Sequence, residues 1–453
     1  MRHTFLLCSA SLLIIYPSVA MAEDKVIVTG TKLDAPLNEL PMSVDVLTAE
    51  DTGSLAALGA AEELTERLAG VEAAVANGTQ IAFQIRGIGA VDHQALTPTA
   101  AAIYVDGVFL ATNVQTGFLL YDLDRAEVLK GPQGTLYGRN ASSGAINFQT
   151  VRPSADQTSH ARLAIGTDSL VDGSGAVGIS FSDSLHGRLA GRFYRRDAML
   201  DNVVTNPDVS APAEGGGERE EYGLRGSLLW EASNGTEVLF RAHTEQDRGI
   251  NPAPRNSSLD VGDHEISIGP DGIQNTDTSF WGASVEVTAS HGEWDIFSLT
   301  AYEGYDQNYG FDFDGTPRPF DNPNLNANLN YDREFWQLSQ ELRAQRSYGD
   351  HRVMIGLAAS TDDFDQDYLI WCGDLDRDTL LGTCPYVGAS GRVGPTPDSD
   401  GQVISLLTRI EQSRDTAALF SYNDIALGEK TTLTLGGRVT WERIEGEGFG
   451  IHI

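Results

Sequence analysis

From about His160 onward, hydrophobic and polar residues alternate along the chain with a period of two. In residues 432–442, Leu433, Leu435, Val439 and Trp441 fall on one face, and the intervening polar side chains fall on the other. Residues 336–345 and 237–245 repeat the pattern. Successive side chains of a strand point to opposite faces, whereas a helix would not separate these residues, so the pattern predicts β-strands.

The connections between these strands alternate between short and long. Tight turns are expected at residues 182–185, 234–235, 291–292, 349–350 and 428–429. Long polar connections are expected at about 197–219, 247–279, 307–333 and 363–413. Short turns at one end and long loops at the other are typical of outer-membrane barrels. We therefore predict a transmembrane antiparallel β-barrel over residues 158–453.

This stretch holds about eleven strands, because the first enters from the periplasmic side and the last ends on the outer side near Ile453. Bacterial outer-membrane barrels have an even number of strands and close on themselves, which leaves no unpaired edge. We therefore expect the sequence to be truncated within the barrel, with about 11 of an expected 22 strands present.

The first 22 residues have the form of a secretory signal peptide. A short basic start precedes an apolar run from Phe5 to Tyr16, and Ala20, Met21 and Ala22 form a small-x-small cleavage site. The run is too short to span a bilayer, and no later stretch offers about 18 consecutive apolar residues. The mature chain keeps Cys372 and Cys384, a pair that we expect to form a local disulfide in an oxidising compartment.

Composition narrows the classes of partner. The 453-residue chain has a formal net charge of −33, which argues against nucleic acid as a partner and against a basic membrane-surface module. An acidic surface could bind divalent cations or cationic ligands, or it could only keep loops soluble. The same alternatives apply to the acidic, Asn-rich residues 311–332, which we interpret as a solvated loop.

Residues 23–153 show a different pattern. Residues 57–68 have a helical pattern, and Gly70 is a plausible stop. Short β-rich runs follow at residues 81–85, 102–108, 125–129 and 144–148. These elements predict a small mixed α+β domain that precedes the barrel.

Four ordered segments identify a family. They are DKVIVTG at residues 24–30, FQIRGIG at 83–89, IYVDGV at 103–108, and the long run LDRAEVLKGPQGTLYGRNASSGAIN at 123–147. In this order and spacing they resemble the plug of TonB-dependent outer-membrane receptors. The resemblance implies a TonB box and periplasmic segment at residues 23–35 and a plug domain at 36–153. It covers the plug fully and the barrel by architecture.

The resemblance implies a partner for the first segment. In the family, the TonB box pairs as an added strand with TonB, a protein anchored in the inner membrane, and strand addition needs β-propensity more than particular side chains. The TonB-box residues here are Val26, Ile27, Val28 and Thr29. The alternative is a disordered tail. No further domain separates the signal peptide from this box, so we predict no signalling role.

The resemblance also implies roles for charged plug residues. In the family, such charges pair with each other and with carboxylates on the barrel wall, where confined ion pairs are strong but exchangeable. The residues concerned are Arg86, Glu127, Lys130 and Arg139. The alternative is that they only stabilise the plug fold.

No enzyme motif accompanies these features. Residues 131–138 are Gly-rich but lack the Lys followed by Ser or Thr of a phosphate loop, and residues 374–378 lack the Gly and Glu of a calcium loop. We expect no enzyme activity, no metal site and no cofactor.

The resemblance implies TonB-dependent active transport of a scarce solute, a ferric siderophore first and cobalamin, haem or an oligosaccharide as alternatives. The expected partners are TonB with its proton-driven complex, outer-membrane lipid and a small ligand such as an iron chelate. A truncated non-transporting remnant, a surface-binding module and a secreted surface enzyme are the competing hypotheses.

Overall fold

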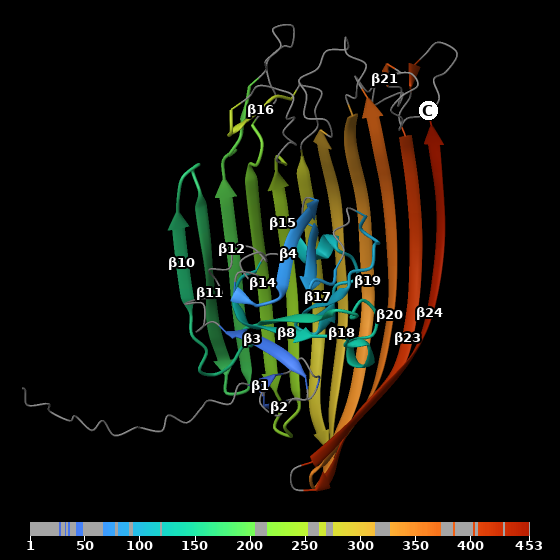
Figure 1. Ribbon diagram of the computed structural model, residues 1–453. Helices are drawn as coiled ribbons and strands as arrows, with labels where there is room; N and C mark the ends of the chain where they lie inside the picture. The colour runs from blue at the N-terminus through green and yellow to red at the C-terminus, as the bar shows by residue number, and fades with distance from the viewer. Residues whose placement is uncertain are drawn as a thin grey trace, which may run out of the picture.

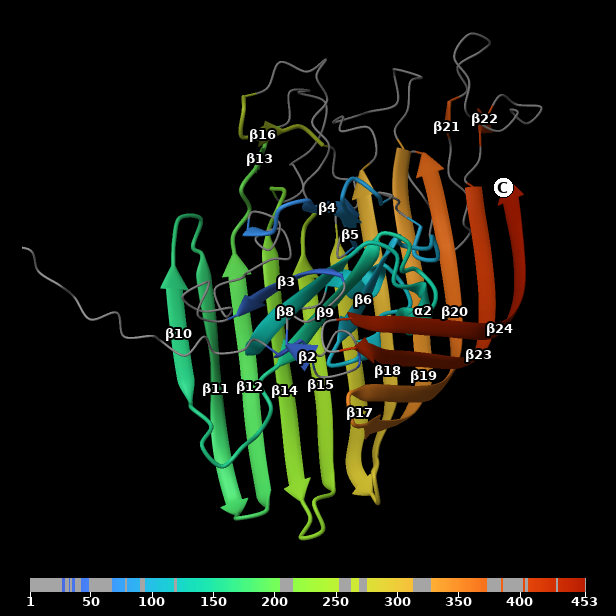
Figure 2. The ribbon, with the colours of Figure 1, turned by 60° about the horizontal axis from the view of Figure 1, so that its bottom comes forward.

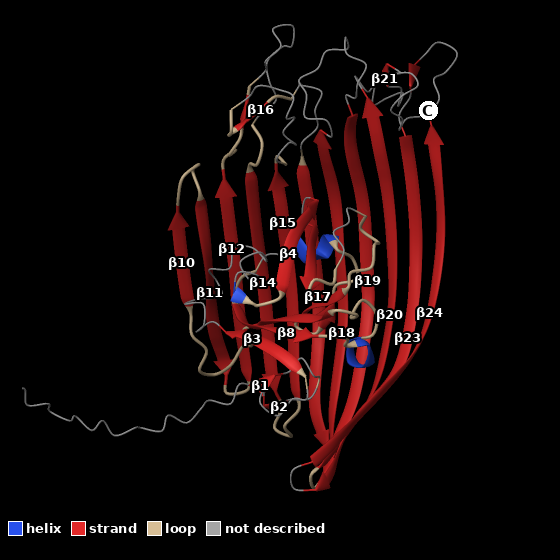
Figure 3. Ribbon diagram, viewed as in Figure 1, coloured by secondary structure: helices blue, strands red, loops and turns tan. Residues whose placement is uncertain are grey.

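The computed structural model has two parts, a large curved sheet and a small domain that lies against its concave face (Figure 1). The described residues are 27–28, 32, 35–36, 42–48, 67–77, 80–89, 94–117, 120–203, 215–251, 262–268, 275–312, 327–372, 384–385, 402–403, 406–428 and 431–452. Strands dominate both parts (Figure 3). No helix in these ranges is long and apolar enough to cross a bilayer.

The large sheet has 11 strands, and every neighbouring pair is antiparallel. In order they are β10 (His160–Ile165), β11 (Val171–Ser182), β12 (Leu185–Arg196), β14 (Arg219–Glu231), β15 (Glu237–Gly249), β17 (Thr276–His291), β18 (Trp294–Asp312), β19 (Ala327–Tyr348), β20 (His351–Cys372), β23 (Leu406–Gly428) and β24 (Thr431–His452). Within the described ranges β10 and β24 are the two edges, so the sheet curves around the small domain without closing (Figure 2). The predicted strand architecture is confirmed.

The two faces of the sheet differ as the alternation predicts. On the convex face, Trp336, Leu338 and Val439 are 39%, 45% and 75% exposed. On the concave face, Arg241 and Glu286 are buried against the small domain. An apolar outer band around a polar interior is the arrangement of a transmembrane barrel, in which lipid replaces water outside.

Three of the predicted long connections are shorter than expected. The one at 247–279 loses a few residues, because β15 continues to Gly249 and β17 already begins at Thr276. The other two lose more. Strand β18 continues to Asp312 and β20 to Cys372, and β23 already begins at Leu406. In these outer extensions Asn308 lies opposite Asp332, so polar side chains occupy the convex face. A strand beyond the lipid layer keeps its hydrogen bonds but needs no apolar face, and the hydrophobic signal used for the prediction therefore ends before the strand does.

The outer connections add short paired segments. Strand β13 (Asp201–Asn202) pairs in parallel with β16 (Glu265–Ile266), which ties two outer loops together, and β21 (Cys384–Pro385) pairs with β22 (Gln402–Val403). The side chains of Cys372 and Cys384 lie outside the described part, so the disulfide stays a prediction.

The small domain is built on a mixed five-stranded sheet of order β3-β8-β9-β6-β7. Its strands are β3 (Ser43–Thr48), β6 (Ala101–Val105), β7 (Val108–Phe109), β8 (Leu123–Lys130) and β9 (Gly144–Thr150), and only the β6–β9 pair is parallel. A hairpin of β4 (Val71–Asn77) and β5 (Gln80–Ile85), the 3-10 helix η3 (Val114–Gly117) and the short helix α2 (Gly134–Tyr137) complete it. Ile85, Val128 and Phe148 lie in its core, and each is 0% exposed. The predicted helix at 57–68 lies, except for Arg67 and Leu68, outside the described residues.

Candidate functional site: the interface between plug and wall

The first contact between the small domain and the wall is a buried ion pair at Asp122. Arg188 on β12 donates from Nε to Asp122 Oδ2 at 2.7 Å and from Nη2 to Oδ1 at 2.5 Å. The two side chains are 3% and 4% exposed. Arg225 on β14 donates to the carbonyl of Tyr121 at 3.1 Å, and its guanidinium lies 4.4 Å from the ring centroid of the same tyrosine. The segment before β8 is therefore bonded directly to the wall.

The second contact is at Asp106, in the turn of the β6–β7 hairpin. Thr150 donates to it from its backbone N–H at 2.8 Å and from Oγ1 at 2.7 Å, and Arg241 Nε lies 3.4 Å away. Burial alone would raise the pKa of Asp106, but Arg241, Arg225 and the Thr150 hydrogen bonds together hold this pKa below its ordinary value. The carboxylate is therefore charged in the assembled interface.

Arg241 extends this contact toward the short turns. It donates to Glu286 on β17 at 3.1 Å, and Glu286 also pairs with Arg152, which follows the small domain in the chain. Arg152 lies 3.2 Å from Glu237 at the start of β15. A continuous row of alternating charges thus runs from the hairpin to the chain segment that joins the two domains.

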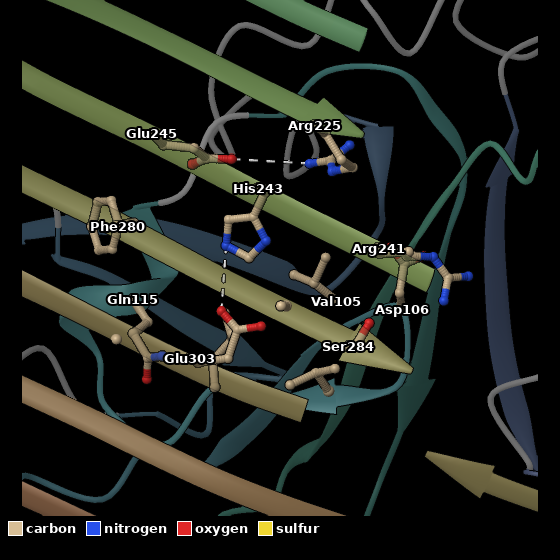
Figure 4. Close-up of a pocket in the computed structure, with 14 residues that line it drawn as sticks. Val105, Asp106, Gln115, Arg225, Arg241, His243, Glu245, Phe280, Ser284 and Glu303 are labelled. Carbon is tan, nitrogen blue, oxygen red and sulfur yellow. Dashed lines mark ion pairs between the residues drawn. The ribbon is translucent and has the colours of Figure 1, made fainter. Parts of the chain in front are cut away.

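A small cavity of about 50 Å³ lies beside Asp106, between the hairpin and strands β14, β15, β17 and β18. His243 faces Glu303 at 3.3 Å across it, and Arg225 faces Glu245 at 4.0 Å (Figure 4). Because opposite charges face one another among apolar side chains such as Val105 and Phe280, the cavity has no uniform sign of charge. It offers space for little more than water.

A third contact involves Lys32, at the tip of the N-terminal ribbon. Strand β1 (Ile27–Val28) pairs with β2 (Ala35–Pro36), and Lys32 lies between them. Its ammonium pairs with Glu341 on β19, and Arg343 donates to the Lys32 carbonyl at 2.6 Å. Burial lowers the pKa of Lys32, and Glu341 offsets this only in part.

Aromatic rings complete the Lys32 environment. The ammonium lies 5.4 Å from the centroid of Tyr137 and 5.2 Å from that of Phe420. Tyr104 donates from its hydroxyl to the Tyr137 carbonyl at 3.0 Å, which connects the β6–β7 hairpin to helix α2. A cation between two rings and a carboxylate is held from several sides.

On the outer side, the small domain meets an aromatic surface of the wall. Ala95 and Val114 pack against wall rings, and those rings belong to Phe280, Tyr305, Phe335 and Phe364. Arg333 lies on β19 two positions before Phe335, nearer the outer loops. It is 1% exposed and donates to Gln366 at 2.7 Å and to Gln307 at 2.9 Å. A second aromatic cluster, formed by Tyr309, Tyr331 and Tyr368, continues this surface toward the outer ends of β18, β19 and β20.

The four charged residues singled out in the sequence lie in different settings. Arg139 reaches the wall, 3.2 Å from Asp362 and 3.4 Å from Glu442. Glu127 accepts from Arg125 Nε at 2.7 Å inside the small domain. Lys130 pairs with Asp45 and donates to the Ala69 carbonyl, also inside it.

Arg86 is exposed with φ of 54°, and the structure brings it to no carboxylate within the described ranges. Its backbone N–H donates to the Gly70 carbonyl at 2.7 Å. Of the TonB-box residues, Ile27 and Val28 form β1, whereas Val26 and Thr29 lie outside the described part. The coupling roles of these residues stay predictions.

Sequence reasoning missed Asp106, Asp122 and Lys32 as interface residues. Asp106 and Asp122 have φ of 50° and 51°, a conformation that Asp tolerates better than most residues. The sequence pattern predicts one β-rich run over residues 102–108, but the structure divides this run into β6 and β7 with a turn at Asp106 and Gly107. The Asp-Gly pair inside that run was the available signal for the turn. The wall partners could not be found, because alternation shows which side chains face inward but not which plug atom each one meets.

A small domain held by ion pairs against the concave face of a strand wall is the arrangement of a plugged outer-membrane barrel. Residues 36–145 match the family model of the TonB-dependent Receptor Plug Domain. The chain is 28% identical over 227 residues to the ferrichrome outer membrane transporter/phage receptor of Escherichia coli (strain K12), covering 48% of this chain and 27% of that protein. It is 33% identical over 165 residues to the pesticin receptor of Yersinia pestis, covering 34% of this chain and 22% of that protein.

Solved structures agree in fold. The ferric yersiniabactin uptake receptor of Yersinia pestis superposes with a TM-score of 0.67 at 17% identity, covering 89% of this chain and 61% of that one. The ferripyoverdine receptor of Pseudomonas aeruginosa gives 0.67 at 16%, covering 94% and 55%. The matches thus span about half of the solved receptors and less of the curated relatives. Residues 36–145 thus match the plug of TonB-dependent receptors, and the strand sheet has the fold of part of the barrel of siderophore receptors.

Proposed function

We propose that the protein takes part in TonB-dependent uptake of a scarce solute, a ferric siderophore, across the outer membrane into the periplasm. The observation that carries this proposal is the polar mounting of the plug. Ion pairs such as Asp106–Arg241 and Arg139–Asp362 hold it against the inner wall. A wide barrel would be an open pore without a plug, and charge-assisted contacts in a wet lumen are strong yet exchangeable.

The substrate class rests on relatives. The names of those relatives mention ferrichrome, ferric yersiniabactin and ferripyoverdine, which supports a ferric chelate. A vitamin B12 transporter of Vibrio vulnificus (strain CMCP6) is 27% identical over 176 residues, so cobalamin is the second candidate. Haem and oligosaccharides are further alternatives. A panel of these solutes as sole iron, cobalamin or carbon source, with and without the gene, tests the choice by growth.

The energy source is proposed to be TonB. Ile27 and Val28 are extended in β1, a conformation suited to pairing with a further strand. Deleting residues 26–29 should abolish uptake of radiolabelled iron chelate while surface binding of the chelate continues. Uptake that survives the deletion would contradict energy coupling through this segment.

A second candidate function is surface binding without transport. Intact binding with no uptake in the unmodified protein would favour it, and it would leave the outer aromatic surface near Arg333 as the functional part. In either case we propose a location in the outer membrane, with the apolar convex face of the sheet in contact with lipid.

A further inference from the structure

Three cavities lie in succession between the β6–β7 hairpin and the wall. The outer one, of about 50 Å³, is bounded by Val108, Arg225 and Glu303. The second, of about 590 Å³, extends to Gly235 and Ser290 beside the short turns. The third, of about 130 Å³, extends sideways to β20 and β24. Asp106 lines the first and second, and the second and third share Lys32, Tyr104, Gly107, Tyr137, Leu299 and Glu341.

The hairpin separates the outer cavity from the large one. Val108 of β7 packs in one buried cluster with Leu299 and Ala301 of β18, and Asp106 is held by Arg241 at the same level. A space of about 590 Å³ lies within the range of about 300–1,000 Å³ typical of small-molecule sites. The 50 Å³ cavity has room for little more than water, so a solute could pass here only if the hairpin moved.

The plug is bonded differently on its other side. There Arg188, Arg192 and Arg225 donate to residues 120–122, and Asp122 is fully enclosed with Arg188. Moving the hairpin breaks one enclosed ion pair, Asp106 with Arg241 at 3.4 Å, and separates Val108 from Leu299. Releasing residues 120–122 breaks the two-hydrogen-bond pair of Asp122 with Arg188 and two further arginine bonds, which costs more. Displacement of the plug should therefore begin at the hairpin.

We propose that the solute leaves the lumen between the β6–β7 hairpin and strands β15, β17 and β18, and that the hairpin is the gate. The segment at residues 120–122 stays bonded to β12 and β14 during passage. This route rests on the transport function proposed above.

Lys32 connects the gate to the N-terminal segment. It lies four positions after Val28 and occupies the junction of the two larger cavities, where it pairs with Glu341. Tension on β1 would withdraw Lys32 from this junction. The inner end of the route would then open in the same movement that takes the Lys32 ammonium away from the rings of Tyr137 and Phe420.

A pair of reversible cross-links tests the route in cells that express the receptor. Val108→Cys with Leu299→Cys, bridged by a short thiol cross-linker, locks the hairpin to β18. Thr135→Cys with Gly436→Cys is the matched control: a Cβ at Gly436 would lie 2.8 Å from Thr135 Cγ2, so this pair links helix α2 to β24. The probe is radiolabelled ferric ferrichrome, or the chelate from the growth panel that the cells take up.

The first cross-link should lower the rate of uptake at least about tenfold and leave surface binding unchanged, and reduction should restore uptake. The control cross-link should leave uptake intact. Uptake through the locked hairpin would overturn the route. Equal block by both pairs would also overturn it, because the whole plug would then have to leave. Absence of uptake before any cross-linking would instead refute the transport function, and the route with it.

Discussion

Arg188 on the wall encloses Asp122 on the plug with two hydrogen bonds, of 2.7 and 2.5 Å, and neither side chain is more than 4% exposed. The two residues are 66 positions apart in sequence. A pair so enclosed contributes little more to net stability than an apolar pair would, but removing one partner leaves a buried charge without its counter-charge.

Asp122→Ala should therefore destabilise the docked plug by about 3–5 kcal/mol. The measurement is protease resistance of the plug in the membrane-embedded protein, followed with increasing urea. Arg443→Ala is the control, since Arg443 and Glu445 form an exposed pair on β24. Replacing both Asp122 and Arg188 by Ala should recover part of the loss. A single Asp122 variant as resistant as the control would contradict the role of this pair.

The sequence could predict the wall far better than the interface. The alternation that puts Leu433 and Val439 on one face is a local pattern, and those residues are indeed exposed on the convex side. Asp122 and Arg188 carry no local sign of their pairing, because it depends on where the plug docks. Arg139, expected from the resemblance to meet wall carboxylates, lies beside Asp362, whereas Arg86 meets none in the described ranges.

The strand ends were missed for a related reason. Periodicity reports burial, and the outer parts of β18 and β20 have polar residues on the face that lower down is apolar. Backbone pairing with the neighbouring strand keeps these segments extended after the side-chain pattern has faded.

Asp106 predicts a pH dependence. Its pKa lies below the ordinary 3.8, so the folded interface binds the proton less readily than the unfolded chain does. The stabilisation is therefore complete well above pH 3.8 and is lost as the pH falls below that value. Asp106→Asn should make the plug less resistant to protease at pH 7, and the difference from wild type should shrink as the pH is lowered toward 3.

Asp168→Asn is the control for this experiment. Asp168 has a similar φ of 54°, but it lies exposed in the turn between β10 and β11. Its substitution should leave plug resistance unchanged at every pH. A difference between wild type and Asp106→Asn that stays constant from pH 7 to 3 would argue against a charged Asp106 in the interface.

Lys32 should anchor the N-terminal ribbon to the wall. Lys32→Met removes the pair with Glu341 and keeps an apolar chain between Tyr137 and Phe420. A thiol reagent should then label Ile27→Cys about tenfold faster, the change that a loss of about 1.4 kcal/mol in anchoring produces. Lys130→Met, which removes a cation bonded only to plug groups among the described residues, should leave the labelling rate unchanged. Equal labelling rates in the wild type, Lys32→Met and Lys130→Met would show that Lys32 does not anchor the ribbon.

Gly138 should be intolerant of any side chain. It follows helix α2 with φ of 79°, and a Cβ there would lie 2.9 Å from Arg438 Nη2 on β24. The left-handed conformation costs a non-glycine residue about 1–3 kcal/mol, and displacement of the guanidinium from its place over Phe420 adds to this. Gly138→Ala should therefore loosen the plug against β24, measured as faster proteolysis after α2.

Gly134→Ala is the matched control within the same helix, because a Cβ there meets nothing within 4 Å and its φ is not in the left-handed region. Alanine favours helix over glycine by roughly 1 kcal/mol, so Gly134→Ala should be neutral or slightly stabilising. If the two variants were equally resistant to protease, the close approach of α2 to Arg438 would have no energetic weight.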